Sequence, residues 1–485
     1  MGIVRKQSLR NTLVTYLGFA IGAINTLVLY TKFLTAEYFG LVGVILSTAA
    51  VLMPIMAFGV QNTLVKFYSK YEHTKELNSF LMLMLLLPLV FIIPIAAFSF
   101  LANDIIGSFL ATENAIVKDY VWYIFLIGFA MAYFEVFYAY AKVQMKSIFG
   151  NFMKEVFVRL GVSILLILVS FEVISVDFFL MALVGLYILR LIIMKIYAYS
   201  VKIIRFNFVF PADTKRIVKY SALIILGGSA AVILLEIDKV MINNFIAIEN
   251  VAYYSVAIFI ATVIAVPYRA MHQITYPLTA EILNRKDKPA LATLYQKSSL
   301  TLFIIAGLVF LLIVLNINDL YTILPEAYRG GATVVFLIGL TKVYDSILGN
   351  SNAILYNSDY YRAILIMGVL LALLVVLLNY VFIPLYGLEG AALATFIAIF
   401  AYNSIKLWYV KAKFGILPFT IDTVKVIFLL LVVGFAFYFV SLPFNPILNI
   451  LIKSLVITIL YVLVIYRFKI SEDVYAVLHK VIGKK

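Results

Sequence analysis

The chain has 485 residues, of which 65% are hydrophobic and only 13% charged, with a mean hydropathy of +1.07. So few charges exclude a soluble globular domain, because they cannot cover its surface. A net charge of +14 would suggest nucleic-acid binding in a soluble protein, but here the basic residues flank long apolar stretches, where they indicate membrane topology and attraction to anionic headgroups.

Fourteen apolar stretches follow one another along the chain, and each has roughly the 20 residues that a helix needs to cross the hydrocarbon core. The first follows Arg5, Lys6 and Arg10 without a small-residue cleavage site, so we interpret it as a retained span and not a removed signal. The predicted spans are residues 12–34, 40–63, 79–102, 119–142, 152–172, 176–203, 217–246, 250–274, 295–317, 332–356, 362–383, 388–410, 422–441 and 448–467.

The basic residues alternate between the connections of these spans. Most Lys and Arg residues fall on every second connection, and only Lys32, Lys118, Arg329 and Lys453 fall on the connections between those. Because Lys and Arg are retained on the cytoplasmic side during insertion, the alternation predicts an even number of membrane crossings, with both termini cytoplasmic. The predicted cytoplasmic set is Arg5, Lys6, Arg10, Lys66, Lys70, Lys75, Lys142, Lys146, Lys154, Arg159, Lys195, Lys202, Arg205, Lys215, Arg216, Lys219, Arg285, Lys286, Lys288, Lys297, Arg362, Lys406, Lys411, Lys413, Lys425, Arg467, Lys469, Lys480, Lys484 and Lys485.

A weak internal repeat relates the first two spans to the seventh and eighth. Both copies begin on the predicted cytoplasmic side, so the halves would be parallel repeats; chance similarity between apolar helices is the alternative. The matched positions are Leu17-Gly18 with Leu226-Gly227, Glu37 with Glu249, and Pro54 with Pro267. The repeat predicts an N-terminal six-helix bundle over residues 1–205, a second over 206–415, and two further transmembrane helices with a cytoplasmic tail over 416–485.

Ionisable residues inside spans are costly and usually face a cavity or a partner. Spacing allows Glu236 to pair with Lys239 and Lys342 with Asp345, and similar depth allows Glu135 to pair with Arg190. Asp238 and Arg269 are then left without an obvious neighbour. The predicted spans contain Glu135, Arg190, Glu236, Asp238, Lys239, Arg269, Lys342 and Asp345.

An enzyme is the least favoured class of function. Its chemistry would need positioned acids, histidines or a metal site. The histidines His73, His272 and His479 are far apart, and His272 is expected at the inner interface. The sequence has no Asp-x-Asp, no phosphate-binding glycine loop, no Gly-x-Ser-x-Gly and no cysteine. We therefore expect no catalytic residue, no metal and no cofactor.

Three stretches carry a resemblance to a known family. The first runs from Asn379 through Pro384 and Gly387 to Thr395. The second joins Tyr16-Leu-Gly18 to Glu37-Tyr38-Phe39-Gly40, and the third is Asp238 followed by Val251-Ala-Tyr253-Tyr-Ser-Val-Ala257. Over essentially its whole length, the chain resembles the polysaccharide transporter (Wzx-type oligosaccharide flippase) branch of the multidrug/oligosaccharidyl-lipid/polysaccharide (MOP) superfamily.

The resemblance implies an all-α polytopic membrane protein with about 14 helices, in two parallel-repeat six-helix bundles around a central cavity plus two C-terminal helices. It also implies a flippase that moves a lipid-linked (polyprenyl diphosphate) oligosaccharide across the cytoplasmic membrane by alternating access, for surface polysaccharide, O-antigen or capsule biosynthesis. The implied partners are that lipid, the membrane lipids, and a polysaccharide polymerase or glycosyltransferases. No nucleic-acid partner is expected.

A diphosphate headgroup in a low-dielectric cavity needs guanidinium or ammonium groups. The candidates are Arg269, then Arg190, Lys342 and Lys239. The alternatives are snorkelling to the interface for Arg269 and structural ion pairs for the two lysines. Candidates for a gate or for coupling are Asp238, Glu135 and Asp345.

Two other transport functions stay open: a cation-coupled multidrug exporter of the same superfamily and a lipid II flippase. A drug exporter calls for free carboxylates in a cavity, whereas the plausible pairings leave no cluster of them. The sequence does not decide whether a proton or a sodium ion would drive the cycle.

Overall fold

The computed structural model describes residues 2–204 and 209–482, and every regular element in that part of the chain is a helix. Arg205, Lys484 and Lys485 of the predicted basic set lie outside the described residues. The chain forms two compact units: unit 1 comprises Met1–Ser255 and Asn379–Gly387, and unit 2 comprises Val256–Leu378 and Leu388–Lys485. The three-part division predicted from the sequence stays a prediction.

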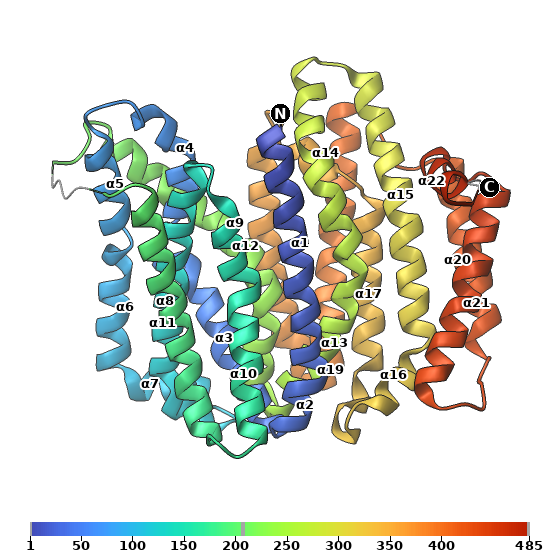
Figure 1. Cartoon of the computed structure of the whole chain (residues 1–485), viewed down its shortest axis with the longest axis horizontal. Coiled ribbons are helices and arrows are strands. Elements are labelled where there is room, and N and C mark those ends of the chain that lie inside the picture. Colours follow the sequence, from blue (N-terminus) through green and yellow to red (C-terminus); the bar gives the residue numbers. More distant parts are fainter. Residues whose placement is uncertain (1, 205–208, 483–485) are drawn as a thin grey trace. The chain divides into compact units, whose positions relative to one another are not determined.

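Unit 1 is built from the N-terminal helices, shown in blue to green in Figure 1. Short π-helical and 3-10 segments (η) interrupt or precede several of them. The elements are α1 Gly2–Ile24, η1 Asn25–Leu29, α2 Tyr30–Phe33, α3 Ala36–Met56, α4 Val60–Tyr71, α5 Leu77–Leu86, α6 Leu89–Leu101, α7 Asn103–Leu110, η2 Ala115–Tyr120, α8 Val121–Val143, α9 Ser147–Phe152, η3 Met153–Phe157, α10 Val158–Ser170, α11 Val176–Val201 and α12 Thr214–Phe245.

Helix α13 crosses from unit 1 into unit 2, which contains most of the remaining elements. The bounds are α13 Glu249–Thr262, η4 Val263–Ala265, α14 Val266–Asn284, α15 Lys288–Leu315, α16 Ile317–Ile323, η5 Glu326–Gly331, α17 Ala332–Ile347, α18 Ser351–Tyr356, α19 Tyr361–Phe414, α20 Ile421–Tyr438, α21 Pro446–Arg467 and α22 Glu472–Ile482.

Eleven helices of the described chain are long and apolar enough to cross a membrane. One of them, α19, covers the two predicted spans 362–383 and 388–410. The two spans are separated at Gly387, where the backbone leaves the helical region with φ +58° and ψ −132°. The predicted fifth and seventh spans correspond to α9–α10 and to α12. The chain is therefore an all-α polytopic membrane protein, as the hydropathy predicts.

The eighth and tenth predicted spans are among those that differ from the helices that form. The eighth, predicted to end at residue 274, continues as α14 to Asn284, because Pro277 is accommodated inside the helix. The tenth, predicted as one helix over 332–356, is broken between α17 and α18 at Gly349, whose φ of +50° favours glycine.

The residues matched in the weak repeat can be placed on their helices. Glu37 and Glu249 each lie in the first turn of a helix, α3 and α13, where an acidic side chain complements the helix dipole. Pro54 lies in the last turn of α3, and Pro267 opens α14 directly after the 3-10 turn η4. The repeat itself stays a prediction, and the Leu226-Gly227 match involves side chains outside the described part.

The basic connections of unit 1 meet at one end of its helices. Lys70 and Tyr71 contact Asp213, and the Lys66 ammonium lies 4.4 Å from the centre of the Tyr220 ring. Tyr140, near the end of α8, donates a hydrogen bond to the Lys202 carbonyl at 3.0 Å. The charge alternation predicts that these connections share one side, and their contacts confirm it.

Helices α20 and α21 lie side by side, in red in Figure 1, and pack on α15 within unit 2. Val426, Ile457 and Tyr461 are buried in the apolar cluster that joins them. The Tyr461 hydroxyl donates to the Ile304 carbonyl at 3.0 Å, so the ring is buried without leaving its polar atom unpaired.

Candidate functional site

A cavity of about 600 Å³ lies within unit 2, between helices α14 and α18. It combines one cation with four aromatic rings and two amides, and no carboxylate lines it. This mixture can hold an anion and pack against a partly apolar ligand. The lining residues are Tyr268, Arg269, His272, Gln273, Tyr276, Asn352 and Tyr356.

The spacing on α14 builds the aromatic wall of this cavity. Tyr268, His272 and Tyr276 follow one another at four-residue intervals, which places them on one helix face. Their ring centres are 5.9 Å and 5.2 Å apart along that face. Asn352 of α18 donates to the Tyr268 hydroxyl at 3.2 Å, which joins the two helices that form the cavity.

Arg269 lines this cavity, and its predicted depth near the inner end of a span stays a prediction. Because α14 continues to Asn284, Arg269 lies about 22 Å from the end of its helix. No salt bridge involving Arg269 occurs among the described residues. His272, expected at the inner interface, also lines the cavity.

Lys406, which the sequence interpretation did not connect with a site, is hydrogen-bonded to a residue that lines this cavity. It was assigned to a cytoplasmic connection, but α19 buries it with only 2% of its surface exposed. Its ammonium donates to Asn352 Oδ1 at 3.0 Å and lies 4.9 Å from the centre of the Tyr402 ring. Its position inside the predicted span 388–410 was the signal that could have identified it.

The hydrogen bonds around Asn352 form a chain from Lys406 to the cavity wall. Lys406 donates to the amide oxygen of Asn352, and the amide nitrogen donates to Tyr268. The side chain of Asn352 is therefore fixed from both sides, with its oxygen toward a buried charge. This arrangement orients the Tyr268 ring without placing Lys406 in the cavity lining.

The predicted pair of Lys342 and Asp345 does not form. Asp345 accepts a hydrogen bond from Asn403 Nδ2 at 2.7 Å, so a side chain of α19 takes the place expected for Lys342. Lys342 is half-buried on α17, makes no salt bridge among the described residues, and does not line the cavity.

The pair of Glu236 and Lys239 is confirmed. The Lys239 ammonium lies 2.9 Å from Glu236 Oε2 on the same face of α12. Ser47 of α3 donates to the same carboxylate oxygen at 2.7 Å. Lys239 is thus neutralised within unit 1, as the ion-pair alternative for this lysine predicts.

The predicted pair of Glu135 and Arg190 is also absent. Glu135 instead binds Lys154 of η3, at 2.5 Å. Arg190 is 6% exposed, and its guanidinium lies 4.2 Å and 4.7 Å from the ring centres of Phe134 and Tyr187. The charge of Arg190 is therefore held by aromatic faces.

Asp238, expected to lack a neighbour, has two within unit 1. It accepts a hydrogen bond from the Tyr254 hydroxyl at 2.5 Å and another from Asn379 Nδ2 at 2.7 Å, and it is 3% exposed. Asp238 and Tyr254 belong to one of the three stretches that carry the family resemblance, and Asn379 belongs to another. Distant motifs therefore meet at one buried carboxylate.

Comparisons with known proteins agree with this architecture. A family model described as polysaccharide biosynthesis protein matches residues 4–283. The structure of "Lipid II flippase MurJ, inward closed conformation" is similar over 95% of this chain and 99% of that one, with a TM-score of 0.75 and 15% identity.

An inward-facing multidrug resistance MATE transporter of the MOP superfamily is similar over 83% of this chain and 94% of that one, with a TM-score of 0.63 and 14% identity. A MOP superfamily transporter from Pyrococcus furiosus Vc1 gives a TM-score of 0.56 over 86% of this chain and 97% of that one, at 13% identity. None of the curated protein sequences matches the chain. At these identities, the solved structures show a common fold and no more.

Proposed function

Because the chain belongs to the polysaccharide biosynthesis protein family, we propose that it is a flippase that moves a lipid-linked oligosaccharide across the cell membrane by alternating access. Its fold is that of MOP superfamily transporters, which supports transport and not catalysis as the class of function. The proposed cargo is an oligosaccharide on a polyprenyl diphosphate, destined for a surface polysaccharide such as O-antigen or capsule.

The observation that supports this cargo is the lining of the cavity in unit 2. Arg269 supplies a guanidinium, which binds phosphate oxygens in a bidentate manner. Tyr268, Tyr276 and Tyr356 supply rings whose faces pack on the C–H faces of sugars, and their hydroxyls bond to sugar hydroxyls. A ligand with a phosphate and sugars satisfies both kinds of group.

The lining argues against a cation-coupled exporter of cationic drugs. A cation in a low-dielectric cavity needs an opposite charge, whereas the seven lining residues include no carboxylate and one arginine. A lipid II flippase would differ from our proposal in its cargo. The similarity to MurJ supports a lipid-carrying fold without identifying what this chain carries.

The proposed setting is the cytoplasmic (inner) membrane, with both chain ends in the cytoplasm. The partners we propose are the glycosyltransferases that assemble the oligosaccharide and the polymerase that extends it, and they include no nucleic acid. We also propose Asp238, Glu135 and Asp345 as the groups that gate the transporter or couple it to an ion. The ion whose gradient drives the cycle would be a proton or a sodium ion.

A leaflet-resolved assay of lipid-linked saccharides tests the function. Cells depleted of the protein should accumulate the lipid-linked oligosaccharide in the cytoplasmic leaflet, and re-expression should restore its appearance outside. Accumulation of lipid II in the inner leaflet would instead favour that cargo. Unchanged saccharide lipids together with increased drug sensitivity would favour an exporter, and normal export without the protein would contradict the proposal.

A further inference from the structure

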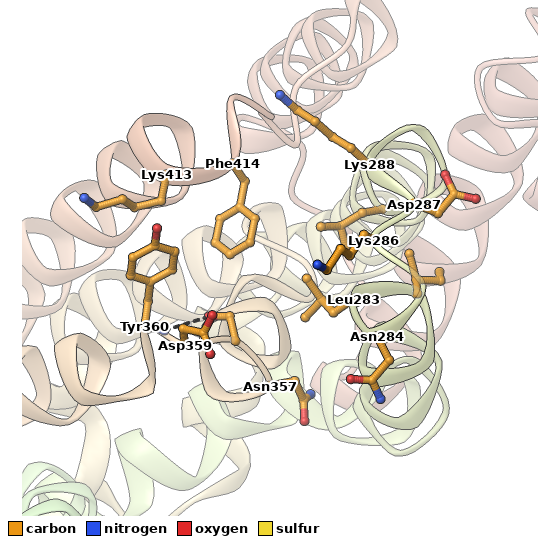
Figure 2. A pocket seen from close by; sticks show the side chains of 13 residues that line it. Leu283, Asn284, Lys286, Asp287, Lys288, Asn357, Asp359, Tyr360, Lys413 and Phe414 are labelled. Atoms are coloured by element: carbon orange, nitrogen blue, oxygen red, sulfur yellow. Dashed lines mark hydrogen bonds between the residues drawn. The ribbon is translucent and has the colours of Figure 1, made fainter.

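A second cavity lies where three predicted cytoplasmic connections of unit 2 meet. It has a volume of about 450 Å³, which is within the range of small-ligand sites. Its walls come from residues 282–291, 357–360 and 413–414, at the junctions of α14 with α15, of α18 with α19, and at the end of α19 (Figure 2). The charge alternation places all three segments on the side that faces anionic headgroups.

The charge of this cavity is basic. Lys286, Lys288 and Lys413 line it, and none of them makes a salt bridge within the described part of the chain. Of the two acids, Asp287 is already used, because its Oδ1 accepts the backbone N–H of Ala290 at 3.0 Å to cap α15. Three lysines against Asp287 and Asp359 leave one net positive charge, and the N-terminal end of the 28-residue α15 adds to it.

Lys286 follows the C-terminal end of α14 in a left-handed backbone conformation. Its φ is +56°, in the left-handed region where a side chain crowds the following carbonyl and where glycine is the usual residue. Figure 2 shows its side chain pointing into the cavity, past Leu283. The same conformation ends α8, α10 and α21 at Met145, Glu172 and Lys469, so it positions the Lys286 side chain and is not by itself a sign of a ligand.

The remaining lining is half apolar and half polar. Leu283, Leu291 and Phe414 line the cavity together with Asn357 and Ser358. A free inorganic ion would leave the apolar part without a partner. The Asn357 amide nitrogen and the Ser358 hydroxyl already bond to backbone carbonyls, which leaves the Asn357 amide oxygen to accept from a ligand. An amphiphile would place its charged group at the lysines, a hydroxyl at this oxygen, and its apolar part against the leucines and Phe414.

We propose that this cavity binds the headgroup of an anionic glycerophospholipid from the cytoplasmic leaflet, a phosphodiester with free hydroxyls such as phosphatidylglycerol. The ammonium groups bind the phosphate, and the single net positive charge of the lining matches a single phosphodiester charge. The site is separate from the cavity that contains Arg269, and it does not depend on which cargo the protein carries.

The test measures lipid binding to the purified full-length protein in phosphatidylcholine nanodiscs titrated with phosphatidylglycerol. Lys286→Gly and Lys413→Gln should each bind about tenfold more weakly, because each loses one charge-assisted hydrogen bond. Lys286→Gly should also fold at least as well as the wild type, because glycine suits the left-handed position. The matched control is Lys411→Gln, which removes an equal charge from an exposed residue of the same helix that does not line the cavity.

The wild type and the Lys411→Gln control should bind phosphatidylglycerol with equal affinity and show no comparable saturable site for phosphatidylcholine. Unchanged binding by well-folded Lys286→Gly and Lys413→Gln would overturn the proposal. Full competition by millimolar glycerol 3-phosphate would assign the cavity to a soluble phosphate and overturn the lipid as its ligand. Stronger binding of a polyprenyl phosphate than of phosphatidylglycerol would assign it to cargo and overturn the proposal equally.

Discussion

Among the four predicted headgroup ligands, Arg269 lines a cavity, whereas Lys239 is neutralised by Glu236 and Arg190 is enclosed by aromatic rings. We predict that Arg269→Glu lowers export of the lipid-linked oligosaccharide by at least about tenfold, because it removes a charge-assisted bond and adds repulsion toward phosphate. Export normalised to protein abundance in the membrane measures the effect.

The matched control for this change is Arg362→Glu, an exposed arginine of α19 outside the cavity lining. It carries the same reversal of charge and should leave export near the wild-type level. Lys239→Gln should have a smaller effect than Arg269→Glu. Wild-type export from Arg269→Glu at normal abundance would remove this residue from the site.

Lys406 does not line the cavity, but hydrogen bonds connect it to the cavity wall through Asn352 and Tyr268. Lys406→Met keeps the apolar volume but leaves the Asn352 oxygen unpaired, which should cost about 1–3 kcal/mol of stability and lower export. Adding Asn352→Leu removes the unpaired group, so the double variant should be destabilised by less than the sum of the single changes. Melting temperatures of the four proteins measure this coupling, and strict additivity would contradict the proposed chain of hydrogen bonds.

At the scale of single elements, the turn inside α19 depends on one glycine. Gly387 adopts φ +58°, and no atom outside its local backbone and its chain neighbours lies within 4 Å of the point that a Cβ would occupy, so a side chain there would meet backbone strain and no packing neighbour. Gly387→Ala should therefore destabilise the protein by about 1–2 kcal/mol. Gly185→Ala, equally uncrowded but inside helix α11, should stabilise it by up to about 1 kcal/mol. Thermal unfolding in detergent compares the pair, and equal shifts would contradict the backbone explanation.

The start of α12 is tied to the end of α4 by Asp213. Burial raises the pKa of Asp213, but hydrogen bonds from Lys70 and Tyr71 and the Lys70 charge outweigh it and hold the pKa below its usual value of 3.8. A lowered pKa contributes stability above the unfolded pKa, and that contribution is lost as the pH falls through the folded pKa.

We therefore predict that Asp213→Asn costs about 1 kcal/mol at pH 7, an estimate reduced for partial exposure of the pair. The difference in melting temperature from the wild type should begin to shrink as the pH falls below about 4, the unfolded pKa, and should continue to shrink through the lowered folded pKa, where the native carboxylate becomes neutral. A difference that stays constant down to pH 3 would show that the charge of Asp213 contributes nothing.

At the scale of the whole chain, hydropathy and charge predicted the spans because both act along the sequence, one span or connection at a time. The partner of an intramembrane charge was predicted correctly only where that partner lies on the same helix, as for Glu236 and Lys239. The partners that the sequence did not indicate are Lys154 for Glu135, Asn403 for Asp345 and Asn379 for Asp238. They are set by helix packing, and the packing of α14 with α18 likewise forms the cavity around Arg269.

The orientation of the chain can be tested directly, because the sequence contains no cysteine and the wild type gives no background for thiol labelling. Glu113→Cys and Glu326→Cys lie on the predicted outer connections of unit 1 and unit 2, and a membrane-impermeant maleimide should label them in intact cells. Lys75→Cys and Lys411→Cys, on predicted inner connections, should react only after permeabilisation. Each unit thus contains its own inner and outer reporter, so labelling of Lys75→Cys or Lys411→Cys in intact cells would contradict the predicted orientation of the unit that carries it.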